Sequence, residues 1–242
     1  MGIMMNPLNT VMFNGTNLAD YGVYVSGDQT FSSAERDYEE IEIPGRSGSL
    51  FIDNKRFKNT EHSYDAWIGE DLENNLTALR AFLLSSTGYC RLEDTYHPDE
   101  FCKAIFKGPL DVETILLEAG VFTLTFTRMP QRFLKSGEIE VELTATDTIK
   151  NPTLYASKPL VRVYGYGDIV VNGYSITIAQ NDLPYIDIDS EVVDCYCYQS
   201  NANSYVTMNS VNYPVLSPGS NLITISSPTI TKLVITPRWW TV

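Results

Sequence analysis

The chain has 242 residues, of which 43% are hydrophobic and 19% are charged, and its formal net charge is −13. These proportions are typical of a folded soluble protein, and the length allows one large or two ordinary domains with their own cores. The negative charge argues against an electrostatic grip on nucleic acid or on an anionic lipid surface.

The charge is unevenly distributed along the chain. Residues 1–150 contain 13 Lys and Arg against 24 Asp and Glu, a net of −11, whereas residues 151–242 contain 4 against 6, a net of −2. The two parts therefore look like units with different tasks. No apolar run reaches the roughly 20 residues that cross a bilayer, and "MGIMMNPLNTVMF" lacks the features of a signal peptide, so we expect cytoplasmic synthesis.

The first part alternates between strand and helix patterns. "GVYVSG" at 22–27 and "YEEIEIPG" at 38–45 alternate with period two and predict strands, as does the stretch 50–69. Over 70–86 the period changes, because leucines fall at steps of four, three and four: Leu72, Leu76, Leu79 and Leu83. That spacing predicts one helix with a single apolar face. "VFTLTFTRM" at 121–129 returns to a strand pattern.

The second part reads as short strands separated by turns. Residues 130–159 are polar, rich in Thr and interrupted by Pro, which predicts a domain junction. Asn172-Gly173 predicts a tight hairpin turn, and Pro218-Gly219 predicts another turn. Strands roughly every ten residues indicate a β-sandwich or jelly roll of about ninety residues. The predicted domains are residues 1–140 and 151–235.

We find no convincing catalytic or cofactor-binding constellation, and we expect neither an enzyme nor a bound cofactor or metal. Of the two histidines, His62 is predicted to be exposed, and His97 to lie on a turn between strands. His97 could be drawn as a metal site with Cys90 and Cys102, but these residues lack paired zinc-ligand spacing. Cys195 and Cys197 share one face of an expected strand and look like core residues.

Two further motifs resemble known sites only in part. Asp187, Asp189 and Glu191 alternate like calcium ligands, but the glycine and distal glutamate of an EF-hand loop are absent, so we predict a solvated strand face. "IPGRSGSL" at 43–50 lacks the Lys-Ser/Thr pair of a phosphate-binding loop.

The stretch 35–58 stands out by its charges. It carries acidic residues on its first arm and basic residues on its second; the candidate interface residues are Glu35, Asp37, Glu39, Glu40, Arg46, Lys55, Arg56 and Lys58. These charges either pair across a hairpin within one chain or join the acidic arm of one copy to the basic arm of the next. The second arrangement is head-to-tail, and it closes into a ring if its rotation allows.

Several of these fragments, in this order, resemble the distal tail proteins (Dit) of long-tailed phages that infect Gram-positive bacteria. The fragments include "FNGTNLADYGVYVSG", "EIEIPGRSGSLFIDNKRF", "FTLTFTRMPQRFL", "YPVLSPGSNLITI" and the final "ITPRWW". The resemblance implies a mainly β protein. Its N-terminal β-sandwich-like ring domain would carry one helix and a protruding hairpin, and its C-terminal domain would be a galectin-like β-sandwich.

The resemblance also implies a structural role in the virion. Members assemble as hexameric rings that join the major tail protein to the tail-associated (Tal) tip protein, with DNA passing through the lumen. In some phages the outer domain carries receptor-binding or baseplate proteins. The expected location is the distal end of the tail. An acidic ring domain suits a DNA conduit, because a negative lumen repels phosphate.

The end of the chain, "ITPRWW", raises a separate question, since most chain ends are polar and poorly packed. Trp239 and Trp240 would point to opposite sides of a strand, so one core face does not cover both. The resemblance implies that residues 236–242 return to the N-terminal domain. On that basis Pro237, Trp239 and Trp240 are predicted to clamp the two domains together.

A second function remains open from the residues alone. A galectin-like sandwich with exposed tyrosines could act as a carbohydrate-binding module that contributes to host adhesion. However, the second part has no histidine, and its only arginines are Arg162 and Arg238. A compact polar cluster for a sugar cannot be assembled from the sequence.

Overall fold

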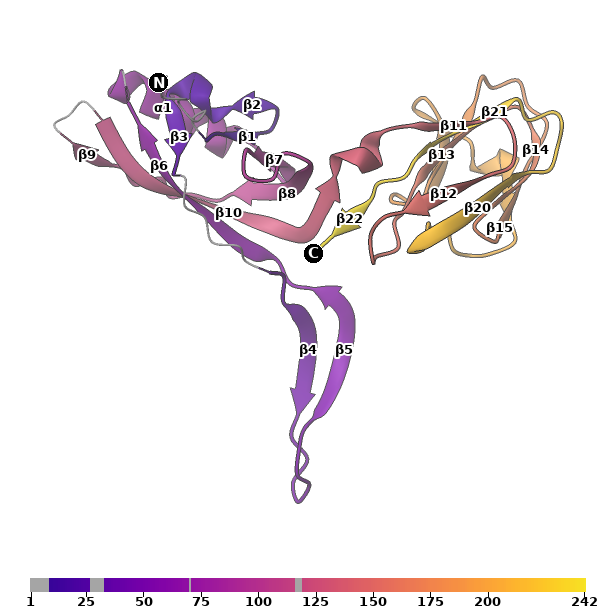
Figure 1. Cartoon of the computed structure of the whole chain (residues 1–242), viewed down its shortest axis with the longest axis horizontal. Coiled ribbons are helices and arrows are strands. Elements are labelled where there is room, and N and C mark those ends of the chain that lie inside the picture. Colours follow the sequence, from indigo (N-terminus) through magenta and orange to yellow (C-terminus); the bar gives the residue numbers. More distant parts are fainter. Residues whose placement is uncertain (1–8, 27–32, 70, 116–118) are drawn as a thin grey trace, which may run out of the picture. The chain divides into compact units, whose positions relative to one another are not determined.

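The structure, a computed structural model, describes residues 9–26, 33–69, 71–115 and 119–242 (Figure 1). The chain divides into two compact units. The first comprises residues 1–132 together with Val242, and the second comprises Phe133–Thr241. The division therefore lies before residue 140, and residues 133–150 belong to the second unit instead of forming a separate junction.

The first unit is built on one antiparallel sheet in the order β2-β1-β7-β8-β10-β6-β3, with β9 pairing with β10. Its strands are β1 (Val11–Phe13), β2 (Thr16–Asn17), β3 (Val23–Val25), β6 (Thr60–Ile68), β7 (Cys90–Asp94), β8 (Glu100–Phe106), β9 (Glu113–Ile115) and β10 (Ala119–Leu134). Its helices are the short η1 (Leu18–Tyr21) and α1 (Leu72–Ser85).

The predicted helix is confirmed, and it covers the core with the expected face. Leu79 and Leu83 of α1 are fully buried, while Leu72 and Leu76 are partly buried against the same core. The predicted strand at 121–129 is also confirmed within β10, where Phe122, Leu124 and Phe126 are the buried residues of the alternating pattern.

The prediction that His62 is exposed is wrong. In the register of β6 and β10, Phe126 lies opposite His62 and Leu124 lies opposite Tyr64, so His62 belongs to the core face. Its side chain is 4% exposed and its ring packs edge-on against Tyr64 at 4.6 Å. Burial lowers the pKa of His62 to about 4.

A second sheet of the first unit consists of two strands only, β4 (Arg36–Ile41) and β5 (Leu50–Phe57), which pair with each other. They form a hairpin, residues 36–57, that runs into β6 with only Lys58 and Asn59 between β5 and β6 (Figure 1).

The second unit is a sandwich of two antiparallel sheets, which confirms the predicted mainly β fold. One sheet has the order β11-β21-β13-β16-β17-β18 and the other the order β12-β20-β14-β15-β19. The strands are β11 (Val141–Leu143), β12 (Asp147–Asn151), β13 (Leu160–Tyr164), β14 (Gly167–Val171), β15 (Tyr174–Ile178), β16 (Ile186–Asp189), β17 (Asp194–Cys197), β18 (Ser200–Asn201), β19 (Val206–Met208), β20 (Gly219–Ile225) and β21 (Lys232–Thr236). Short 3-10 turns are η2 (Lys135–Glu138) and η3 (Asn203–Tyr205).

The prediction of a hairpin turn at Asn172-Gly173 is confirmed, and so is the prediction that Cys195 and Cys197 are core residues. Asn172 and Gly173 connect β14 to β15 with φ of 47° and 87°, the positive values that a two-residue hairpin turn requires. Cys195 and Cys197 are buried free thiols of the sandwich. The strands β11 and β12 were not predicted, because both are edge strands, β11 has only three residues and β12 is mostly polar.

The prediction of a solvated face at Asp187 and Asp189 is wrong. The two side chains are 3% and 5% exposed, and each carboxylate receives a two-pronged hydrogen bond from an arginine. Arg162 bonds Asp187 at 2.7 and 2.9 Å, and Arg238 bonds Asp189 at 2.6 and 2.8 Å. Buried carboxylates need such partners, and the sequence spacing does not reveal them.

Candidate assembly interface

The tip of the hairpin is a tight turn that the sequence "IPGR" encodes. The backbone N–H of Arg46 donates to the carbonyl of Ile43 at 3.1 Å, which closes a four-residue turn. Pro44 suits the second position of such a turn, and Gly45, with φ of 81°, suits the third, where a positive φ is required. The local sequence therefore places Arg46 at the exposed tip of the hairpin instead of in a phosphate-binding loop.

Half of the candidate interface charges pair within the hairpin. Lys58 bonds Glu35 at 2.8 Å and Arg56 bonds Asp37 at 2.6 Å. A third pair, Arg36 with Asp53 at 3.1 Å, also crosses between the arms. The hydrogen bond from Arg56 lowers the pKa of Asp37, and the one to Glu35 raises the pKa of Lys58. Of the two arrangements that the sequence allowed, Glu35, Asp37, Arg56 and Lys58 adopt the one in which charges pair between the two arms of one chain.

The other four predicted residues behave differently. Within the described part of the chain, the side chains of Glu39, Glu40, Arg46 and Lys55 form no ion pair. All four are exposed. They remain available to a partner, and the prediction that they contribute to an interface between copies stays a prediction.

The hairpin also exposes apolar side chains on both of its faces, which the sequence reading missed. In the register of β4 and β5, Tyr38 and Phe51 fall on one face and make an edge-on contact at 6.1 Å. The opposite face carries Ile41, Leu50 and Ile52. Their exposed fractions range from 38% for Ile41 to 60% for Phe51. The sequence did contain a signal for this surface. When the residues of the two strands are assigned to alternate faces, both faces receive large apolar side chains, so one core cannot cover them all.

A two-stranded hairpin of this kind is marginal in water on its own. It has two unpaired edges, and apolar groups on both faces remain in contact with solvent. Exposed apolar surface of this extent marks a site of protein association. The hairpin is therefore the strongest candidate for an interface in the first unit.

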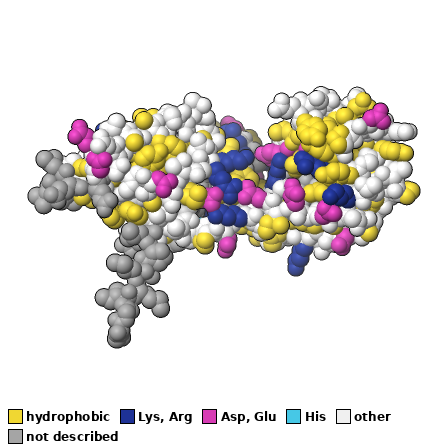
Figure 2. Space-filling model, turned by 90° about the horizontal axis from the view of Figure 1, so that it is seen from above, with side chains coloured by type: hydrophobic (Ala, Val, Ile, Leu, Met, Phe, Trp, Pro, Cys, Tyr) yellow, Lys and Arg dark blue, Asp and Glu magenta, His cyan; other side chains and the backbone are white. Residues whose placement is uncertain are grey.

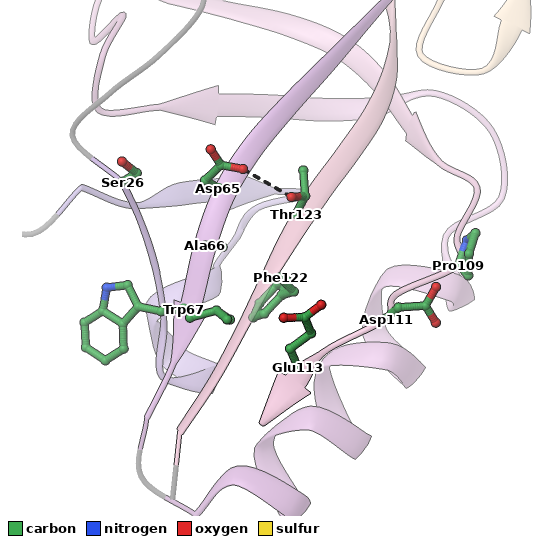
Figure 3. A pocket seen from close by; sticks show the side chains of 10 residues that line it. Ser26, Asp65, Ala66, Trp67, Pro109, Asp111, Glu113, Phe122 and Thr123 are labelled. Carbon is green, nitrogen blue, oxygen red and sulfur yellow. Dashed lines mark hydrogen bonds between the residues drawn. The ribbon is translucent and has the colours of Figure 1, made fainter. Parts of the chain in front are cut away.

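A separate hollow lies on the solvent side of the same unit, over β6, β9 and β10 (Figure 3). Its volume is about 660 Å³, and its wall includes Trp67 and Val121, each 39% exposed. Asp65, Asp111 and Glu113 supply carboxylates to its lining, and Thr123 donates to Asp65 at 3.1 Å. The hollow is thus both aromatic and acidic. The sequence did not predict it, because its residues come from four separate segments.

Residues 237–240 are anchored inside the second unit. Trp239 is 5% exposed and belongs to the sandwich core, and its carbonyl accepts from the backbone N–H of Leu134 at 2.9 Å. Trp240, in the short strand β22 (Trp240–Thr241), stacks on Tyr155 at 4.5 Å, and its indole N–H donates to the carbonyl of Ala156. The carbonyl of Pro237 accepts from the hydroxyl of the buried Ser157 at 2.7 Å.

Arg238 adds an electrostatic anchor. The carboxylate of Asp189 accepts two hydrogen bonds from Arg238, one from the hydroxyl of Tyr196 and one from the backbone N–H of Glu191. The approach is close, since a Cβ on Gly137 would lie 2.2 Å from the backbone nitrogen of Trp239. These contacts explain the sequence "PRWW" at 237–240, and a clamp between the two units by Pro237, Trp239 and Trp240 stays a prediction.

Among the described residues, no group of three or more His, Cys, Asp and Glu side chains is arranged to hold a metal ion. In the same part of the chain, no helix combines the length and hydropathy of a membrane span.

Charged side chains of both signs and hydrophobic side chains lie close together on the surface of the second unit (Figure 2).

Comparison with solved structures reveals a similar fold. The chain superposes on the crystal structure of the SPP1 Dit (gp 19.1) protein with a TM-score of 0.70 and 14% sequence identity. The match covers 97% of this chain and 100% of that chain. The SPP1 protein is described as a paradigm of the hub adsorption apparatus in phages that infect Gram-positive bacteria. No family model and no curated protein matches the sequence.

The comparison shows a shared fold across both units. At 14% identity it says nothing about which side chains have the same task.

Proposed function

We propose that this chain is a structural protein of a phage tail, located at the distal end of the tail. There it forms a closed hexameric ring that joins the tail tube to the tail-associated tip protein and the baseplate. The DNA passes through the lumen of the ring. In this role the chain acts by shape and contact, without catalysis.

The extent of the structural likeness supports this proposal. Both units and their connection are found in one hub protein, with 97% of this chain covered. A shared fold alone does not fix a function, since many folds serve several tasks. The hairpin supplies the specific observation.

The hairpin carries the proposal, because the described residues of a single chain leave the apolar side chains on both of its faces exposed. Tyr38 and Phe51 lie on one face and Ile41, Leu50 and Ile52 on the other, all of them exposed. A contact made by the hairpin of one copy with a different surface of the next copy is heterologous, and repeated rotation closes such a contact into a ring. Glu39, Glu40, Arg46 and Lys55 would set the register of that contact.

The remaining partners follow from the proposed position. The major tail protein would bind one side of the ring and the tail-associated tip protein the other, and receptor-binding or baseplate proteins would attach to the second unit. The acidic first part, with a net charge of −11 over residues 1–150, suits a passage for DNA, since like charges keep the polymer from adhering.

Negative-stain images of the purified chain, alone and mixed with its neighbouring tail proteins, test the proposal. We expect six-fold annular particles, with a mass close to six copies in solution or after addition of a tail neighbour. Native mass spectrometry measures the stoichiometry independently. Particles that contain this chain but show no closed annulus, even with its tail neighbours present, would contradict the proposal.

A further inference from the structure

The six-stranded sheet of the second unit presents an aligned row of aromatic side chains to solvent. Its opposite face builds the core through Val161, Val163, Ile186 and Ile188, so Arg162, Tyr164 and their neighbours point outward. Tyr164 lies opposite Lys232 in the pairing of β13 with β21.

The same row continues across the next two strands. Arg162 pairs with Asp187, and Asp187 pairs with Tyr196. Antiparallel partners step in opposite directions, so Tyr185 lies beside Tyr164 and Tyr198 lies beside Tyr185. The ring centroids confirm that the three side chains are neighbours, since Tyr164 and Tyr185 are 5.9 Å apart with their planes at 53°, and Tyr185 and Tyr198 are 5.2 Å apart with their planes at 60°. We call Tyr164, Tyr185 and Tyr198 the tyrosine row.

Two cationic side chains, Arg162 and Lys232, pack against rings of the tyrosine row. The guanidinium of Arg162 lies 4.2 Å from the ring centre of Tyr185, and the ammonium of Lys232 lies 4.9 Å from that of Tyr164. Arg162 is itself fixed by its two hydrogen bonds to the buried Asp187. A surface that is ordered before binding loses little entropy when a ligand arrives, which favours recognition.

The charges around the row are already compensated. Arg162 pairs with Asp187, and Lys232 pairs with Glu142 at 2.9 Å. Within the described residues, no hydrogen bond occupies the hydroxyl of Tyr185 or Tyr198. The surface thus offers aromatic rings and free hydroxyl groups without an unpaired charge. This combination matches a neutral, polyhydroxylated ligand better than an ionic one.

The backbone at Tyr198 provides an independent observation. Cys197 pairs with Ser200, so Tyr198 and Gln199 form a two-residue turn. Tyr198 has a φ of 54°, in the left-handed region where such turns normally use Gly, Asn or Asp. Its side chain is 70% exposed, so core burial does not offset the strain. Strained backbone of this kind clusters at functional sites, which fits a binding role for the exposed ring of Tyr198.

We propose that the tyrosine row is a carbohydrate-binding surface, on which a neutral oligosaccharide lies across Tyr164, Tyr185 and Tyr198. The sugar rings pack their C–H faces on the aromatic rings, and the sugar hydroxyls exchange hydrogen bonds with the tyrosine hydroxyls. Two steps of 5.9 and 5.2 Å between rings suit a ligand of at least two sugar units. This surface lies on one unit and does not depend on ring formation.

The test uses the full chain on a printed array of defined neutral oligosaccharides of glucose, galactose, rhamnose and N-acetylglucosamine. Isothermal titration with the best array saccharide then compares the chain with two variants. Tyr198→Gly removes the ring and suits the positive φ, so its melting temperature should be equal to or above that of the parent. Its affinity should fall about tenfold. Tyr205→Ala, a tyrosine of η3 that is 37% exposed, is the matched control and should leave the affinity unchanged.

Three results would overturn the proposal. These are an array without any bound saccharide, an affinity that Tyr198→Gly does not change, and loss of a tail-protein contact in place of a saccharide contact. The last result would assign the tyrosine row to a protein interface. Masses of the same samples in solution report ring formation separately, so a failure of this proposal is distinguishable from a failure of the proposed structural role.

Discussion

The hairpin at 36–57 and the final residues 237–242 are both rich in large apolar side chains, yet the fold treats them in opposite ways. Phe51 of the hairpin is 60% exposed, whereas Trp239 near the chain end is 5% exposed. Residues 237–240 have a core, a carboxylate and several backbone partners within the second unit, whereas among the described residues β4 and β5 of the hairpin pair only with each other. Apolar residues that the chain covers report on stability, and those that it leaves uncovered report on assembly.

The largest effect on stability is expected from a substitution in the final residues 237–242. Trp239→Ala should lower the unfolding free energy of the second unit by about 3–5 kcal/mol, because it removes a large buried side chain and leaves a cavity. Urea unfolding followed by circular dichroism measures the change. Trp240→Ala, which removes a partly exposed ring, serves as the comparison and should cost clearly less. Equal losses for the two variants would contradict this account of the tail.

A second prediction concerns His62, a buried residue of the strand into which the hairpin runs. Its pKa is about 4 in the folded chain and about 6.5 when unfolded, so between these values the unfolded state binds more protons. Stability of the first unit should therefore fall as the pH drops from 6.5 to 4, by about 3 kcal/mol. Thermal unfolding at several pH values measures the slope.

The matched variant for that experiment is His62→Gln, which has no titrating ring. Its stability should vary less over the same pH range. If the parent and His62→Gln show the same pH dependence, burial of His62 is not its source.

Substitutions in the hairpin should affect assembly and leave stability nearly unchanged, the reverse of substitutions in residues 237–242. The double change Phe51→Ser with Ile52→Ser should leave the melting temperature of the isolated chain nearly unchanged, because both side chains are exposed. It should weaken self-association by about 2 kcal/mol or more, since exposed apolar anchors dominate interfaces. Sedimentation velocity, with and without tail neighbours, measures assembly.

The control for the hairpin is Leu222→Ser, which changes a side chain of β20 that is 56% exposed. Assembly that survives the double change but fails in the control would place the interface on the second unit instead.

The smallest effect is expected at the ion pairs across the hairpin. Asp37→Asn removes the partner of Arg56, but the Arg56 side chain is 75% exposed, so solvent screens the pair and it contributes little. The melting temperature should not change measurably, in low or high salt. Glu40→Lys, at an unpaired position, should instead alter assembly and its dependence on salt. A stronger effect of Asp37→Asn on assembly would show that the paired charges also face a partner.

Much of the architecture was predictable from local patterns. The leucine spacing gave α1, the alternation of β10 gave its buried face, and Asn172-Gly173 gave a hairpin turn. Such patterns repeat along one element, so neighbouring residues are enough to define them. The strands β11 and β12 were missed, because a three-residue strand such as β11 and a mostly polar strand such as β12 show no clear periodicity.

The candidate sites were less predictable, since they depend on partners far away in the sequence. The sequence pattern predicted that Asp187 and Asp189 are solvated, because it does not show that the fold places Arg162 and Arg238 beside them. Likewise, Tyr198 lies beside Tyr185 only because of the register between β16 and β17. His62 looked exposed because its own strand does not identify the face that the other strands cover.

The amino-acid sequence by itself determined the types of element, the turns, the acidic first part and the presence of a charged hairpin. These properties are local, or simple sums over the chain. Only the tertiary structure decided which apolar and charged groups are covered, because burial and ion pairing depend on residues that are distant along the chain and adjacent in space. The tail was thereby assigned to the core of the second unit, and the hairpin was left open to a partner.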